Sequence, residues 1–259
     1  MTSAAFESLL RRDRAIVGAG LAGITLLAWI YLVQMARAMA PMDMGMAMPQ
    51  MHPWSVAELA MLIIMWGIMM VAMMLPSAAP MILTFATVHR RRGEQRRPVV
   101  STGVFVLGYV VVWSAFSVAA ALLQWALHAA ALLSPAMTST SPLVGGGLLV
   151  AAGLFQWTPL KNTCLAHCRS PLSFVMTEWR EGARGAFVMG VRHGIYCVGC
   201  CWVLMGLLFV AGVMNLLWVA AIAVFVLIEK VVPYGEQASR LAGALLIVAG
   251  VAVALRSLS

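Results

Sequence analysis

A histidine and three cysteines recur at short intervals in one apolar stretch of the sequence, at His193, Cys197, Cys200 and Cys201. They stand at i, i+4, i+7 and i+8, so a helix would place all four side chains on one stripe. Thiolate and imidazole ligands suit zinc and also a soft ion such as Cu(I). The alternative is structural, because cysteine is also a small apolar residue and His193 would then mark the point where a helix meets water.

A second group of the same residue types precedes the first. Cys164, His167 and Cys168 stand at i, i+3 and i+4, which is again one face of a helical turn. The two groups together hold all five cysteines of the chain. They also allow a redox interpretation, in which Cys197 and Cys200 form one thiol pair and Cys164 and Cys168 form another.

Methionine is concentrated between residues 39 and 52, where six methionines and a histidine alternate with small residues and prolines. This composition favours an exposed loop over a packed helix. Thioethers bind Cu(I), and unlike thiols they do not form disulfides in an oxidising compartment. The alternatives are a loop without a metal role and an apolar surface for a partner. We expect this Met tract to capture Cu(I) through Met42, Met44, Met46, Met48, Met51 and His52.

Methionine also recurs every four residues in the next apolar segment. Two prolines, Pro76 and Pro80, follow in the same segment. Proline removes helical hydrogen bonds, so we expect a kinked helix in which the carbonyls of Ala72 and Pro76 lose their usual partners. The methionine stripe is either core packing or a path for a metal ion. Its members are Met61, Met65, Met69 and Met73, of which the last three are the candidates for a path.

Composition places these residues in a membrane protein. Apolar residues make up 63% of the 259 residues, charged residues 10%, and the mean hydropathy is +0.94. Soluble domains carry about 25% charged residues. The net charge of +8 comes from short basic clusters between apolar runs, which argues against nucleic-acid binding. We expect an all-α bundle of about seven transmembrane helices, over residues 15–35, 56–88, 98–127, 142–157, 193–213, 216–232 and 237–255.

The expected helices divide the chain into three parts. Residues 1–36 hold an N-terminal tail and the first helix, residues 37–55 form the Met-rich loop, and residues 56–259 form a six-helix membrane domain. Within that domain, residues 158–193 form a charged loop with the second ligand group. The glycine-rich fourth helix offers a close contact face, through which two copies of the chain would associate.

The distribution of basic residues predicts the orientation in the membrane. Fifteen of the seventeen Lys and Arg residues share one side if the N-terminus is cytoplasmic, as expected for an inner-membrane protein. Both cysteine groups then lie at the cytoplasmic end, where thiols stay reduced, while the Met tract faces the oxidising side. Glu229 lies at the cytoplasmic end too, as a candidate metal ligand, proton acceptor or ion-pair partner of an arginine.

Five unusual strings follow one another between about residue 56 and residue 255. They are Met69–Met81, Phe155–Pro171, Gly190–Trp202, Val213–Trp218 and Glu229-Lys230. In these strings the chain resembles a bacterial family of predicted metal-binding integral membrane proteins, domain of unknown function 2182. The resemblance implies metal binding and no settled activity. The Met tract lies outside the strings, so its copper interpretation depends on this sequence alone.

Copper handling accounts for both ligand types together. We expect a protein of the lipid bilayer that captures, transports or delivers Cu(I), with a copper chaperone or a membrane cuproenzyme as partner. The alternatives are a structural zinc site and a thiol-disulfide redox protein. The sequence has no Gly-x4-Gly-Lys-Ser/Thr loop, which argues against an ATP-driven pump, and we do not expect an enzyme.

Overall fold

The computed structural model describes residues 3–43, 55–92, 98–129 and 142–256. No strand occurs in these residues, which confirms the all-α prediction. The helices are α1 (Ser3–Asp43), α2 (Val56–Arg92), α3 (Pro98–Ala129), α4 (Pro142–Phe155), α5 (Pro159–Arg169), α6 (Pro171–Thr177), α7 (Gly182–Gly206), α8 (Leu208–Ala211), α9 (Leu216–Val231) and α10 (Gly235–Arg256).

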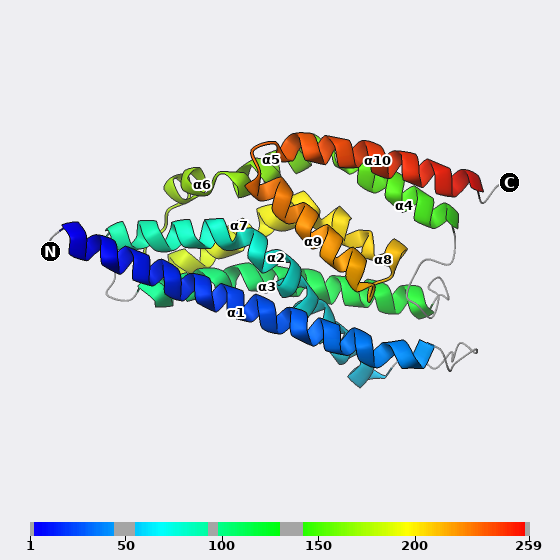
Figure 1. Cartoon of the computed structure of the whole chain (residues 1–259), viewed down its shortest axis with the longest axis horizontal. Coiled ribbons are helices and arrows are strands. Elements are labelled where there is room, and N and C mark those ends of the chain that lie inside the picture. Colours follow the sequence, from blue (N-terminus) through cyan, green and yellow to red (C-terminus); the bar gives the residue numbers. More distant parts are fainter. Residues whose placement is uncertain (1–2, 44–54, 93–97, 130–141, 257–259) are drawn as a thin grey trace.

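Five segments are long and apolar enough to cross a membrane: α1, α2, α3, α7 with α8, and α10. The pair α4 and α5 makes a sixth if it is one span broken by its 61° bend. The expected count of about seven is therefore not reached. The reason is length, because α4 has 14 residues and α9 has 16, against about 20 for a full crossing. The N-terminus and the C-terminus lie at opposite ends of the bundle (Figure 1).

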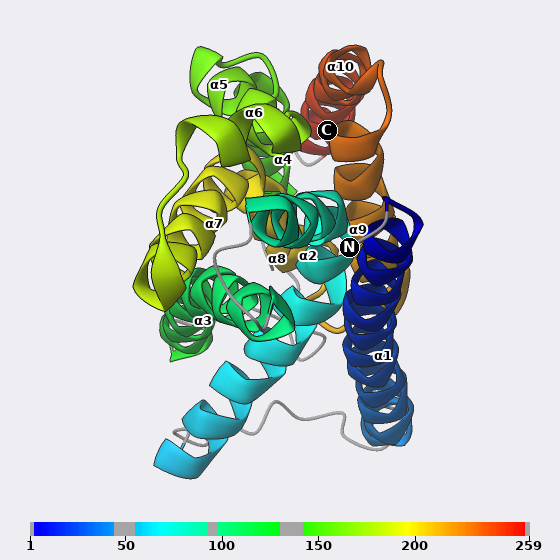
Figure 2. The ribbon, with the colours of Figure 1, turned by 90° about the vertical axis from the view of Figure 1, so that its left-hand side faces the viewer.

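The helix α2 lies at the centre and packs against α1, α3, α6 and α9 (Figure 2). It begins at a capping box, in which the Ser55 backbone N–H donates to Glu58 and the Glu58 backbone N–H donates to the Ser55 hydroxyl. Residues 56–61 are mostly exposed, and most residues from Leu62 to His89 are buried or half-buried. The central position follows from composition, since a helix that is apolar all round is stable where neighbours cover it.

The two prolines of α2 lie inside a continuous helix. Pro76 has no N–H to donate to the carbonyl of Ala72, and Trp29 of α1 donates its indole N–H to that oxygen at 3.2 Å. The expectation for Ala72 is thus confirmed, and the group freed by the proline holds α1 against α2. Met74, two residues before Pro76, has a carbonyl that accepts from Tyr109 of α3 at 3.1 Å.

Glycines set the closest helix contacts. A Cβ at Gly190 of α7 would lie 2.0 Å from the Phe105 carbonyl oxygen of α3, and one at Gly153 of α4 would lie 2.6 Å from the Gly243 carbonyl oxygen of α10. Helix pairs that approach this closely need glycine at the crossing. The glycine face of α4, expected to be open to a second copy, is therefore used here within the chain by α10.

The segment between α4 and α7 differs from the expected charged loop. It forms α5 and α6, and α7 begins at Gly182 rather than at His193. Gly182 has a φ of +74°, a conformation that side chains rarely adopt, and this allows the chain to turn into α7. The early start moves His193 from the expected water interface into the middle of a helix.

Candidate metal centre

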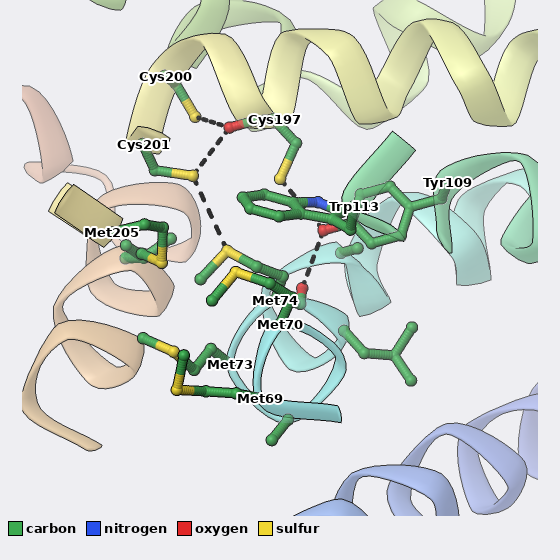
Figure 3. Packing of buried hydrophobic residues seen from close by; sticks show 14 of the residues in the cluster. Met69, Met70, Met73, Met74, Tyr109, Trp113, Cys197, Cys200, Cys201 and Met205 are labelled. Carbon is green, nitrogen blue, oxygen red and sulfur yellow. Dashed lines mark hydrogen bonds between the residues drawn. The ribbon is translucent and has the colours of Figure 1, made fainter. Parts of the chain in front are cut away.

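The helix α7 brings three cysteines to the centre of the bundle. Cys197, Cys200 and Cys201 are all buried and lie on one stripe, as their spacing predicts. The thiols of Cys200 and Cys201 donate to the Cys197 carbonyl oxygen at 3.1 and 2.8 Å (Figure 3). A short polar side chain inside a helix commonly donates to a backbone carbonyl of the preceding turn in this way.

Cys197 has polar neighbours from two other helices. Its Sγ lies 3.1 Å from the Tyr109 hydroxyl of α3 and 2.9 Å from the Lys230 ammonium of α9. Lys230 also donates to the Ser77 hydroxyl of α2 at 3.0 Å. The lysine is only 7% exposed, so the bundle places a positive charge directly beside a thiol sulfur. A buried cation is costly and indicates a functional site.

Cys201 joins the thiols to the methionines of α2. Its Sγ lies 3.8 Å from the Met74 Sδ (Figure 3). The side chains below Met74 in the same view form a column of thioethers, and each is at most 3% exposed. Met61, the first residue of the expected stripe, is 69% exposed and lies outside this column. The column consists of Met69, Met70, Met73 and Met74 of α2, and Met205 of α7 lies beside it. Met65, which is also buried, stands one helical turn before Met69.

The helix α5 adds the remaining two cysteines. Cys168 is buried on α5, which packs against α7. Cys164 packs against α7 at Gly199, where an added Cβ would lie 2.7 Å from the Cys164 sulfur. The two ligand groups, which are far apart in the sequence, therefore meet in space. This juxtaposition was an assumption of the metal hypothesis, and spacing alone does not predict it.

The two histidines lie beside the thiols in different ways. His193 is buried, and its ring stacks on Tyr109 with centroids 5.5 Å apart. Its Nδ1 is buried and has no hydrogen-bond partner among the described residues. His167 stacks on Tyr196 at 4.2 Å, and its Nδ1 lies 2.8 Å from the Thr163 carbonyl oxygen. The structure thus buries His193 beside Tyr109, which also contacts Cys197, whereas His167 is half-buried.

Glu229 belongs to a separate buried polar group. Its carboxylate pairs with Lys161 of α5 at 2.6 Å, and Lys161 also donates to Gln156. Ser239 of α10 donates to the same Gln156 oxygen at 2.9 Å. The expected ion pair of Glu229 exists, with a lysine rather than an arginine. Lys161 and Glu229 are both buried, and their ion pair links α5 to α9.

The thiols are not arranged as a finished metal site. Within the described ranges, no three His, Cys, Asp or Glu side chains form a group that could hold a metal ion as they stand. All five cysteines are free. Because Cys200 and Cys201 are turned toward a carbonyl, their thiols would have to rotate before several sulfurs could bind one ion. The expected ligands Met44, Met46, Met48, Met51 and His52 lie outside the described residues, and Met42 lies in the last turn of α1.

Sequence reasoning missed two of the groups around Cys197. Lys230 is visible only as a basic residue at the end of a helix, where it reads as a topological anchor. Tyr109 is one of five aromatic residues in a long apolar segment, and nothing in the sequence marks it out from the others. The one available clue is the charged pair Glu229-Lys230 at the end of an otherwise apolar run, because ionisable residues near membrane depth are functional candidates.

One comparison with known proteins identifies the family of this chain. A family model described as PpoB2, copper chaperone, matches residues 63–253. The chain belongs to the PpoB2 family. The PpoB2 match covers all five cysteines, the methionine column, Lys230 and Glu229, whereas all of α1 and the Met tract lie outside it. No curated protein and no solved structure matches the chain. Membership in PpoB2 supports the expected copper-related role.

Proposed function

We propose that this PpoB2 protein is a membrane copper chaperone that holds Cu(I) at the α7 thiols and passes it along the methionine column of α2. The observation that carries the proposal is the contact between Cys201 and Met74, with sulfurs 3.8 Å apart. This contact joins the thiols of α7 to the thioethers of α2 in the buried core. Zinc and disulfide chemistry make no use of thioethers, whereas Cu(I) binds both kinds of sulfur.

The thiol site has the charge that a Cu(I) complex in a bilayer requires. Two thiolates with one Cu(I) carry a net charge of −1, which is unfavourable where water is excluded. The ammonium of Lys230, 2.9 Å from Cys197 Sγ, compensates this charge. Cys197 with Cys200 or Cys201 would supply the two thiolates. A divalent ion with the same two thiolates would leave the lysine uncompensated, so the site favours a monovalent ion.

The route and its direction are part of the proposal. We place the N-terminus on the cytoplasmic side of a bacterial inner membrane and the Met tract on the periplasmic side, with the cysteines of α7 in the centre of the bundle between them. The Met tract would capture Cu(I), the column would carry it inward, and the thiols would hold it for transfer. The recipient would be another copper protein of the membrane, since the chain has no nucleotide site to drive uphill transport.

The proposal is tested by titrating Cu(I) into purified protein against a chromophoric chelator. We compare the wild type with the combined variant Cys197→Ser, Cys200→Ser and Cys201→Ser, and with Cys164→Ser as a single-thiol control. We expect tight binding of Cu(I) in the wild type, its loss in the combined variant, and its retention in Cys164→Ser. Equal affinity in all three proteins would remove the thiols of α7 from the function.

The redox alternative draws on the same contact between Lys230 and Cys197, because a cation beside a thiol also suits thiol exchange. It predicts a reversible loss of two free thiols when a quinone is added to metal-free protein. Thiol counting before and after the addition separates the two functions. An unchanged count together with Cu(I) binding supports the copper chaperone, and a reversible loss without Cu(I) binding supports the redox protein.

A further inference from the structure

A second site lies away from the sulfurs, in a groove over α2. Its volume is about 630 Å³, and it is bordered by α1 on one side and by α6 and α9 on the other. We define the lipid groove by the residues that carry the argument: Arg14, Pro76, Leu83, Arg91, Leu172 and Leu227. Nothing in the copper function uses these side chains.

Both ionisable residues of the lipid groove are arginines at one end of it. Arg14 and Arg91 are exposed, and neither makes a hydrogen bond or an ion pair with any described residue. Their positions are fixed by their neighbours in the chain, since Asp13 and Arg90 pair with each other and hold α1 against α2 at this level. Asp13, the acid next to Arg14 in the chain, is therefore already neutralised. Two guanidinium groups at one rim recognise a phosphate.

The wall below the arginines is apolar. Its two threonines, Thr84 and Thr87, donate their hydroxyls to the carbonyls of Pro80 and Leu83 in their own helix, so they add no free donor to the groove. From Pro76 to Arg91 the helix rises about 22 Å at 1.5 Å per residue. One leaflet of a bilayer has about 15 Å of hydrocarbon and about 5 to 7 Å of headgroup. The groove thus matches one leaflet in length and in polarity.

We propose that the lipid groove binds one anionic phospholipid, with its phosphate between Arg14 and Arg91 and an acyl chain along Pro76, Leu83 and Leu227. A free phosphate ion would use only the arginines, and a zwitterionic lipid would lack the net negative charge that they attract. The groove shares its helices with the thiol site, because Pro76 precedes Ser77 and Leu227 lies one turn before Lys230. A bound lipid would therefore hold α9 against α2 where Lys230 donates to Ser77.

Native mass spectrometry of the whole protein in neutral detergent tests this site. We add phosphatidylglycerol or phosphatidylcholine with identical acyl chains, and count bound lipid in the wild type, in the combined variant Arg14→Gln and Arg91→Gln, and in the matched variant Arg180→Gln and Arg184→Gln. We expect one phosphatidylglycerol per wild-type chain and per matched variant. The loss of the two groove arginines should weaken binding about tenfold to thirtyfold, at about 1 kcal/mol per arginine.

The groove itself is tested by filling it. Leu227→Trp keeps both arginines and occupies the apolar part, so it should also weaken phosphatidylglycerol binding, and it gives a readout that does not depend on α1. Equal weakening in the matched arginine variant would mean a diffuse charge effect and would overturn the proposal. So would unchanged lipid binding in Leu227→Trp, since it would remove the acyl chain from the groove.

Discussion

At the scale of single residues, Lys230 is the group that distinguishes this thiol site from a cluster of small apolar cysteines. Its ammonium contacts Cys197 and Ser77 inside the bundle. The adjacent Glu229 points to a different helix, where it pairs with Lys161. Consecutive residues on a helix face different directions, so Glu229 and Lys230 at the end of α9 belong to two separate buried sites.

We predict that Lys230→Met weakens Cu(I) binding by about tenfold or more, which corresponds to about 1.4 kcal/mol. The reason is that the negative charge of a two-thiolate complex loses its buried counter-charge. Chelator competition measures the affinity. Lys230→Arg, which keeps the charge, is the control and should lose less. An affinity in Lys230→Met equal to that of the wild type would mean that the lysine has only a packing role.

Sequence spacing predicted the residues of the site better than their partners. The i, i+4, i+7 and i+8 positions placed the cysteines of α7 on one stripe because α7 is a regular helix. The contacts of Lys230 and Tyr109 depend on how α9 and α3 pack against α7, which no local pattern specifies. For the same reason the prediction that a helix begins at His193 was wrong. The start of α7 at Gly182 does not follow from the residues around His193.

At the scale of elements, the contact between α3 and α7 fixes Tyr109 beside Cys197. It depends on Gly190 and Gly108, whose missing side chains let the two backbones touch. A Cβ at Gly108 would lie 2.3 Å from the Phe187 carbonyl oxygen. Backbone atoms cannot move aside as a flexible side chain does, so the whole helix would have to shift.

We predict that Gly190→Ala destabilises the bundle by about 1 to 3 kcal/mol, as overpacked substitutions do. The added methyl group would lie 2.0 Å from the Phe105 carbonyl oxygen. Gly147→Ala in α4 is the matched control, because nothing lies within 4 Å of its Cβ position. It should be neutral, or more stable by up to about 1 kcal/mol through helix propensity. Unfolding in increasing concentrations of sodium dodecyl sulfate measures both, and equal stability of the two variants would contradict the close contact.

The methionine column gives a second prediction at this scale. Replacing Met69, Met73 and Met74 by leucine keeps the apolar volume, so each change should cost less than about 1.5 kcal/mol in stability. If the column is a path, the transfer of Cu(I) to the thiols should slow markedly, as followed by stopped-flow absorbance of the thiolate complex. Met81→Leu and Met189→Leu are controls, since these two methionines are buried outside the column. Equal transfer rates in all proteins would identify the column as core packing.

The elements were largely predictable from the sequence where hydropathy decides them. The apolar runs gave α2, α3 and α10 with errors of at most four residues at their ends, whereas α1 (Ser3–Asp43) extends well beyond the predicted residues 15–35 on both sides. The region from residue 158 to residue 193 was less predictable, because short helices with mixed polar residues carry little periodic signal. There the Thr158 cap and Pro159 start α5, and Ser170 with Pro171 separates it from α6.

At the scale of the whole molecule, the proposed function needs two ends with different chemistry. The start of α1, which carries Arg11, Arg12 and Arg14, and the end of α2, which carries residues 90–92, lie at one end of the bundle (Figure 1). The Met tract follows the opposite end of α1. This separation supports the proposal that the basic residues and the Met tract lie on opposite sides of the membrane, with the buried thiols between them.

We predict that replacing Met42, Met44, Met46 and Met48 by leucine lowers Cu(I) uptake into vesicles at limiting metal and leaves the thiol site intact. The reason is that the Met tract would raise the local concentration of Cu(I) and take no part in the final complex. Uptake at low and at saturating copper, with bound copper counted at the end, measures both effects. Unchanged uptake at low copper would remove the Met tract from the mechanism.

The central claim is that Cu(I) is held by sulfur from α7 within the bundle, and X-ray absorption at the copper edge tests it most directly. We load the metal-free protein with one equivalent of Cu(I) and compare the wild type with the variant that lacks Cys197, Cys200 and Cys201. We predict an all-sulfur coordination shell in the wild type that is lost in the variant. A shell of nitrogen and oxygen ligands, or the same sulfur shell in both proteins, would contradict the claim.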